Sequence, residues 1–184
     1  MKANSLTERS IIDKLSEASC AGVEINLIIR GICCILPGIE GYTENIRVFS
    51  LVGRFLEHHR VYMFGQKDER KIYISSADIM TRNLARRVEI ACPVLDPELK
   101  SRIEHTAEVI LSDNVKLREL KNDGNYIRVT AGTEKRINAQ DIFIEEAKAG
   151  VVEILGEDTE FREDRRINGF FARLKAMFSD RQKS

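Results

Sequence analysis

The alternation of apolar and polar positions along the first 148 residues predicts strands and helices in turn. The segment 23–36 is almost continuously apolar, which is typical of a strand buried on both faces of an α/β sheet. A glycine-containing turn at 65–70 predicts that the strands on either side of it, 58–64 and 71–75, pair as a hairpin. Further strands are predicted at 46–52 and 88–95, and a second hairpin at 116–129 around Asp123-Gly124.

Helices are predicted where apolar residues recur at helical spacing behind a capping residue. Ser5-x-x-Glu8 is a capping box ahead of such a pattern, which ends at Gly22. The segment 76–87 predicts a short helix capped by Asp78 or Thr81. Asn138 is predicted to cap a last helix. Asp96-Pro97 opens a longer helix with His105 on its outer face and the following residues on its inner face: Leu99, Ile103, Thr106, Ala107, Ile110 and Leu111.

Strands that alternate with helices indicate an α/β domain over residues 1–148, with a mixed β-sheet flanked by helices. The remaining segment, 149–184, begins with a charge-dense stretch and ends with an apolar stripe at helical spacing. That stripe consists of Phe170, Phe171, Leu174, Met177 and Phe178. We therefore predict a charged tether and an extra C-terminal amphipathic helix. Interleaved acidic residues favour docking on a protein surface over peripheral membrane contact.

The composition limits the classes of partner. Lys+Arg and Asp+Glu both number 29, so the formal net charge is zero, which disfavours a nucleic-acid binder. Between Arg47 and Arg87, however, nine basic residues stand against four acidic ones, so positive charge is concentrated there. No apolar run approaches the ~20 residues that an integral membrane helix needs. The polar start is not a signal peptide, and the four cysteines form no C-x-x-C pair, so we expect a cytoplasmic protein with reduced thiols.

The candidate chemistry lies at the end of the buried strand and around the two adjacent histidines. Arg30 closes the strand and precedes Gly31, at the edge where α/β sheets bind ligands; a surface ion pair is the alternative. Alternation along 58–64 places His58 and Arg60 on one face of the strand and His59 on the other. Guanidinium groups bind phosphate oxygens bidentately, and a histidine exchanges protons near neutral pH, so these residues suit a phosphate-rich anion. Neither GxxxxGK[ST] nor GxGxxG occurs.

Three long motifs in this chain resemble the C-terminal catalytic domain of bacterial polyphosphate kinase. They are R-G-I-C-C-x-x-P-G, L-E-H-x-R-V-Y and S-S-A-D-x-M-x-R-N-L, and the resemblance covers residues 2–147. It implies a phospholipase-D-like domain, the second of two such domains that each contribute a histidine motif. His58-x-Arg60 resembles the second motif, and "YISSAD" resembles the serine-rich strand that follows it.

The resemblance also implies an activity and a set of site residues. The activity is reversible transfer of the ATP γ-phosphate to polyphosphate through a phosphohistidine, which would lie in a preceding domain that this chain lacks. His58 would be the catalytic second histidine, and Arg30 and Arg60 would bind phosphate together with it. Possible supporting residues are Ser75, Ser76, Asp78, Arg82 and Asn83. ATP or ADP is the implied substrate, Mg²⁺ ligands are expected outside this chain, and no metal site is expected on it.

Further expectations and two rival functions follow from the same residues. The implied partners are polyphosphate, ATP, the remaining domains of the enzyme and further copies in a homo-oligomer, and this chain alone is predicted to be inactive. Two features depart from phospholipase D itself: Arg60 replaces the usual lysine, and no aspartate has the usual spacing unless Asp68 or Asp78 substitutes. The rivals are a free-standing phosphodiesterase of the phospholipase D superfamily and a non-enzymatic module that binds polyphosphate or nucleotides.

Overall fold

A computed structural model of the chain describes residues 1–66, 69–130 and 135–157. The chain divides into two compact units, Met1–Phe143 and Ile144–Ser184. The predicted apolar stripe from Phe170 to Phe178 lies outside the described residues. The helix α4 (Ala139–Glu157) continues through Lys148, the residue at which we placed the end of the α/β domain. The candidate site lies entirely in the first unit.

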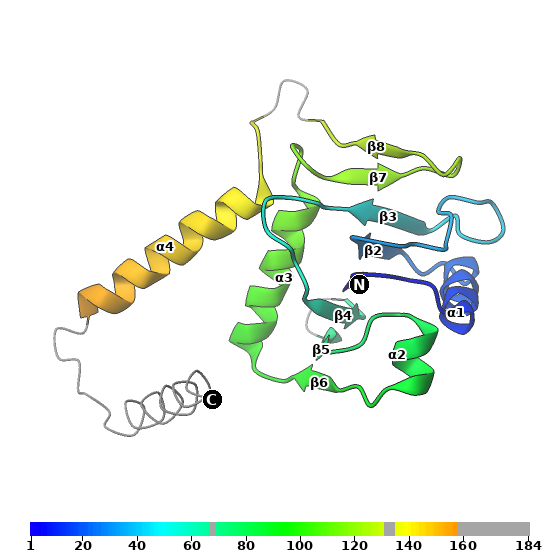
Figure 1. Cartoon of the computed structure of the whole chain (residues 1–184), viewed down its shortest axis with the longest axis horizontal. Coiled ribbons are helices and arrows are strands. Elements are labelled where there is room, and N and C mark those ends of the chain that lie inside the picture. The colour runs from blue at the N-terminus through cyan, green and yellow to red at the C-terminus, as the bar shows by residue number, and fades with distance from the viewer. Residues whose placement is uncertain (67–68, 131–134, 158–184) are drawn as a thin grey trace, which may run out of the picture. The chain divides into compact units, whose positions relative to one another are not determined.

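Eight strands of the first unit form one mixed sheet in the order β6-β5-β4-β1-β2-β3-β7-β8 (Figure 1). The central strands β1, β2 and β3 are parallel, and antiparallel strands continue the sheet on both sides. The strands are β1 (Lys2–Ala3), β2 (Ile25–Ile29), β3 (Ile46–Ser50), β4 (Arg60–Phe64), β5 (Lys71–Ser75), β6 (Ala91–Val94), β7 (Arg118–Leu120) and β8 (Tyr126–Arg128). The predicted mixed sheet and both predicted hairpins are confirmed.

The strand β2 is buried on both faces, as its apolar sequence predicts. Leu27 and Ile29 belong to the hydrophobic cluster on one face, against which Ile11 and Leu15 of the helix α1 (Arg9–Cys20) pack. Ile28 belongs to the cluster on the other face, which includes residues of the helix α3 (Pro97–Leu111) and the start of α4. Helices therefore cover both faces of the sheet at β2, and the end of that strand is where polar groups can gather beside it.

Two predicted helix caps are wrong, because long-range contacts occupy the residues concerned. The helix α1 begins after Glu8, and the Ser5-x-x-Glu8 capping box does not form, since Leu6 pairs instead with Cys33 and Ile79 as an extension of the sheet. The helix α2 (Thr81–Arg86) begins after Met80 and not after Asp78 or Thr81. Asp78 is instead occupied by main-chain groups near the N-terminus.

The other two helices begin where the sequence predicts. Asp96 Oδ1 accepts hydrogen bonds from the main-chain nitrogens of Glu98 and Leu99, and Asn138 Oδ1 accepts one from Gln140 N. The prediction that Leu99 lies on the inner face of α3 is wrong, because its side chain is 53% exposed, whereas Ile110 near the end of the same helix is fully buried. The helix thus approaches the core with its C-terminal half. Within the described residues, no helix is both long and apolar enough to cross a membrane.

The two-residue strand β1 lies at the centre of the sheet, although the sequence gives no sign of it. Lys2 and Ala3 pair in parallel with β2, and Lys2 also pairs with Val61 of β4. Lys2 is buried, and its Nζ lies 3.0 Å from Glu57 Oε2. A charged residue in a two-residue segment shows no periodicity, so only the tertiary pairing defines this strand. The strand matters for the site because Asn4 follows it directly.

Candidate functional site

Arg30 lies immediately beyond the carboxyl end of β2 and is half-buried. Its Nε donates a hydrogen bond to Asn4 Oδ1 at 3.1 Å. Among the described residues this is the one hydrogen bond of the Arg30 side chain, so both terminal nitrogens remain available. The partner is a neutral amide and not a carboxylate, so the alternative of a surface ion pair is not what the structure contains. A guanidinium with a free terminal fork retains its full charge and geometry for an anion.

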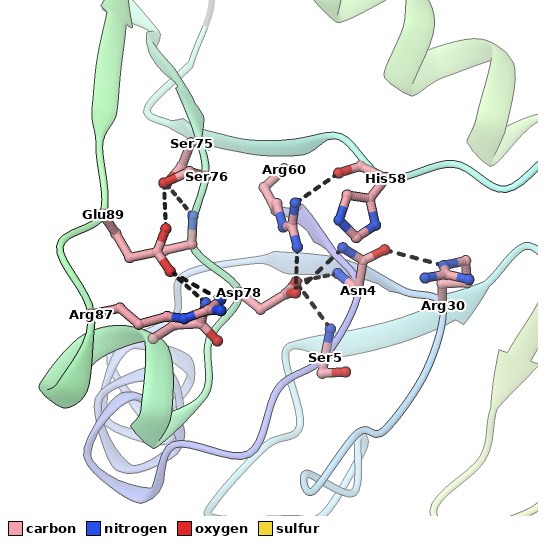
Figure 2. A network of polar contacts seen from close by, with 12 residues as sticks. Asn4, Ser5, Arg30, His58, Arg60, Ser75, Ser76, Asp78, Arg87 and Glu89 are labelled. Atoms are coloured by element: carbon pink, nitrogen blue, oxygen red, sulfur yellow. Dashed lines mark hydrogen bonds and ion pairs between the residues drawn. The ribbon is translucent and has the colours of Figure 1, made fainter. Parts of the chain in front are cut away.

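The carboxylate of Asp78 is the centre of the polar network in Figure 2 and is only 5% exposed. Its Oδ1 accepts hydrogen bonds from Asn4 N at 2.7 Å and Ser5 N at 3.3 Å, and its Oδ2 accepts one from Asn4 Nδ2 at 3.4 Å. The Arg60 guanidinium completes the set with Nη2 at 2.7 Å from Oδ2. Burial by itself would raise the pKa of Asp78, but the hydrogen bonds from Arg60 and the main chain outweigh burial and lower that pKa.

Both terminal nitrogens of Arg60 donate hydrogen bonds within the protein. Its side chain is 12% exposed, Nη2 binds Asp78, and Nη1 donates to the main-chain oxygen of His58 at 3.0 Å. Nε is buried and has no partner among the described residues. The hydrogen bond with Asp78 raises the pKa of Arg60. Arg60 therefore fixes the main chain at His58, and both of its terminal nitrogens already have a partner within the protein, unlike those of Arg30.

The two adjacent histidines have different surroundings. Both are exposed, and both lie directly before β4, which begins at Arg60 and not at His58 as the sequence predicts. The alternation predicted for this strand is present: Tyr62 lies on the Asp78 side and donates through its hydroxyl to Ala77 O at 2.8 Å, whereas His59, Val61 and Met63 line a cavity of about 560 Å³. Desolvation lowers the pKa of His59, and the charge of Lys2 lowers it further. His59 is thus separated from the network that contains Arg60.

Two of the predicted supporting residues, Ser76 and Asn83, bind Glu89, and a third, Ser75, binds the neighbouring Ile90. Ser76 Oγ donates to the Glu89 carboxylate, and Asn83 Nδ2 donates to Glu89 Oε1 at 2.6 Å. Ser75 Oγ donates to Ile90 O at 2.9 Å and accepts from Ala77 N at 3.0 Å. These contacts hold the connection between β5 and α2 against residues 89–90. Arg82 lies exposed on α2 and is not part of either network in the described residues.

The segment that leads to His58 is held by residues that the sequence did not single out. Gln140 is buried at the start of α4; its Oε1 accepts from Phe55 N and its Nε2 donates to Phe55 O, both at 2.9 Å. Gln140 Nε2 also donates to Glu57 Oε1 at 2.9 Å, and Glu57 pairs with Lys2. Gln140 and Phe55 are 85 residues apart, so no local pattern could have predicted this contact.

The described residues offer no group of three His, Cys, Asp or Glu side chains that could hold a metal ion. Asp78, the buried carboxylate beside Arg60, already accepts four hydrogen bonds from Asn4, Ser5 and Arg60. Mg²⁺ prefers several free carboxylate or phosphate oxygens, so this donor set does not fit it. No step below runs through a metal held by this chain.

The sequence of the first unit matches a known family. Residues 1–140 match the family model described as polyphosphate kinase C-terminal domain 2. The chain belongs to the polyphosphate kinase family. The polyphosphate kinase of Bacillus cereus is 54% identical over 139 residues, which are 76% of this chain and 20% of that protein. The polyphosphate kinase of Lactiplantibacillus plantarum is 49% identical over 159 residues, which are 86% of this chain and 22% of that protein.

A solved structure gives the same result for the fold. The crystal structure of polyphosphate kinase from Porphyromonas gingivalis matches with a TM-score of 0.77 and 42% identity, over 81% of this chain and 23% of that one. The predicted phospholipase-D-like α/β fold is therefore confirmed for this polyphosphate kinase domain. The chain spans about a fifth of the length of the polyphosphate kinases that it matches.

Proposed function

We propose that this chain acts as the C-terminal catalytic domain of a polyphosphate kinase. The reaction is the reversible transfer of the ATP γ-phosphate to polyphosphate through a phosphohistidine on a preceding domain. The observation that carries this proposal is the arrangement at the end of β2, where Arg30 is bound through Nε alone and keeps its terminal fork free. A fixed guanidinium of this kind suits the charge that spreads over a transferring phosphoryl group.

We assign different roles to the neighbouring groups. Arg30 binds phosphate oxygens of ATP or polyphosphate, and His58 contacts the phosphates or transfers a proton as general acid or base. Arg60 holds the main chain of His58 through the hydrogen bond from Nη1 and positions that histidine. The phosphate-binding role that the sequence predicts for Arg60 stays a prediction. ATP-binding by this chain, a cytoplasmic location and assembly into a homo-oligomer also stay predictions.

The matched length supports a composite active site. This chain spans about a fifth of its relatives, and no second histidine motif accompanies His58 in it. We therefore expect the 184-residue chain by itself to form no polyphosphate from ATP. Robust synthesis by the purified chain would contradict the proposed division of the site between two domains.

The decisive test uses a full-length chimera, in which residues 1–140 of this chain replace the matching segment of the Bacillus cereus polyphosphate kinase. We expect ATP-dependent polyphosphate synthesis by this chimera, and His58→Ala to lower turnover by about 10²–10⁴-fold if His58 acts as acid or base. His59→Ala is the matched control and should leave turnover near normal, because His59 lines the cavity on the other face of β4. A folded chimera that makes no polyphosphate would overturn the proposal, as would loss of turnover in His59→Ala alone.

The phosphodiesterase rival makes an opposite prediction for the chain alone. A free-standing enzyme of that kind would hydrolyse bis(p-nitrophenyl) phosphate, and His58→Ala would abolish the hydrolysis. We expect no hydrolysis above the uncatalysed rate, because the chain carries a single His-x-Arg motif and its Arg60 is already paired with Asp78.

A further inference from the structure

The side-chain amide of Asn4 lies between the carboxylate of Asp78 and the guanidinium of Arg30. No sequence motif points to Asn4. We propose that Asn4 is a positioning residue for Arg30, which it holds in the orientation that presents the terminal fork to phosphate. This proposal rests on the proposed function in one respect, the role of Arg30 in phosphate binding. Asn4 itself touches neither substrate nor the reacting atoms; it acts through Arg30.

The chemistry of an amide explains why asparagine suits this place. Asp78 is a carboxylate that only accepts hydrogen bonds, and Arg30 is a guanidinium that only donates them. Asn4 offers Nδ2 to Asp78 Oδ2 and Oδ1 to Arg30 Nε, so each end of one amide meets a complementary group. An aspartate at this position would place a second carboxylate against Asp78. A leucine would have the same shape and neither hydrogen bond.

The main chain of Asn4 is fixed as firmly as its side chain. Asn4 N donates to Asp78 Oδ1 at 2.7 Å, and Gly31 N donates to Asn4 O at 2.7 Å. Asn4 is 6% exposed, so its amide has little freedom to turn. Two strands therefore fix the orientation of Arg30. The strand β1 acts through Asn4, which follows it, and β2 acts through the main chain of Arg30 itself.

The network also connects the two residues proposed to meet phosphate. Arg30 donates a hydrogen bond to Asn4, and Asn4 donates one to Asp78 (Figure 2). Arg60 donates one to Asp78 as well and another to the main-chain oxygen of His58. Arg30 and Arg60 use their nitrogens in opposite ways: Arg30 is bound at Nε with its fork free, and Arg60 is bound at its fork with Nε unpaired. This contrast singles out Arg30 as the guanidinium that is held for a ligand.

The test measures whether Asn4 acts through Arg30. In the chimera described above, we expect Asn4→Leu to lower kcat by about 10–10²-fold, because a misplacement near 1 Å has effects of this size. In an Arg30→Ala background, Asn4→Leu should change kcat by less than about twofold, since the group that it positions is gone. If Asn4 contributed only to general stability, the fold-losses in kcat of the two single variants would multiply in the double variant. Multiplying losses, or a normal kcat in Asn4→Leu alone, would overturn the proposal.

A second measurement on the 184-residue chain separates this inference from the proposed function. In nitrogen-15 NMR spectra the Nε–H of Arg30 should exchange slowly with water, and Asn4→Leu should speed this exchange at least tenfold and weaken binding of tripolyphosphate. Asn122→Ala, at an exposed asparagine in the turn between β7 and β8, is the matched control and should change neither. If the chimera makes no polyphosphate but these effects on Arg30 are present, the proposed function fails and the positioning role stands. If Asn4→Leu leaves the Nε–H of Arg30 unchanged, the positioning role fails.

Discussion

Replacing Asp78 with asparagine tests whether the buried ion pair organises the site. The substitution keeps the size of the side chain and an acceptor oxygen for the main-chain nitrogens of Asn4 and Ser5. It removes the negative charge and turns an amide donor toward Arg60 Nη2, which now lies 2.7 Å from a carboxylate oxygen. A buried guanidinium is then left without its counter-charge.

The expected magnitude follows from the burial of both partners. The exposed fractions of the side chains of Arg60 and Asp78 are 12% and 7%, so solvent screens the pair only weakly. Removing one partner of a pair buried in this way costs about 3–5 kcal/mol of unfolding free energy. Since a domain is typically stable by about 5–15 kcal/mol, the loss amounts to a large share of the total.

The assay is urea unfolding of the 184-residue chain at several pH values, with circular dichroism as the probe of unfolding. A carboxyl group whose pKa is lowered in the folded state stabilises that state above its unfolded pKa, and this stabilisation is lost as the pH falls through the folded pKa. The difference in unfolding free energy between the original chain and Asp78→Asn should therefore be largest at pH 7 and shrink below about pH 4. The asparagine variant has no carboxyl group at this position and lacks that component of the pH dependence.

The control is Asp13→Asn, which breaks the exposed pair between Arg9 and Asp13 at adjacent turns of α1. Exposed pairs contribute about 0–1 kcal/mol, so this variant should unfold almost like the original chain. A loss below about 1 kcal/mol for Asp78→Asn, or a loss of the same size at pH 7 and pH 2, would refute the reasoning.

Two further substitutions test the close contacts around the site. A Cβ on Gly31 would lie 3.0 Å from Asn4 O, so Gly31→Ala should displace Asn4, cost about 1–3 kcal/mol in urea unfolding and weaken tripolyphosphate binding. Gly150→Ala, where nothing lies within 4 Å, should be neutral or stabilising; equal effects of the two would contradict this account. Gln140→Ala should cost about 1–3 kcal/mol and speed tryptic cleavage after exposed Arg54, because Phe55 and Glu57 lose their partner; an unchanged cleavage rate would count against it.

The sequence by itself determined most of the helices and strands and predicted where the candidate site residues lie. Apolar runs and alternation are patterns of neighbouring residues, so they can be read from the sequence alone. They located the strand β2, which is buried on both faces, the two hairpins and the helix after Asp96. Arg30 could be placed at a strand end, and His59 could be separated from Arg60, for the same local reason. Long motifs then identified the family, which the relatives confirm.

The tertiary structure alone decided which groups are free and which are engaged. Asn4 contacts Asp78 across 74 residues and Arg30 across 26, and neither separation leaves a local pattern. The sequence predicts the same phosphate-binding role for Arg30, at a strand end, and for Arg60, on the strand face that it shares with His58. Only the folded chain places Asp78 against the fork of Arg60 and a neutral amide against Nε of Arg30. The physical reason is that hydrogen-bond partners in a buried network are chosen by three-dimensional proximity, which local residue patterns do not encode.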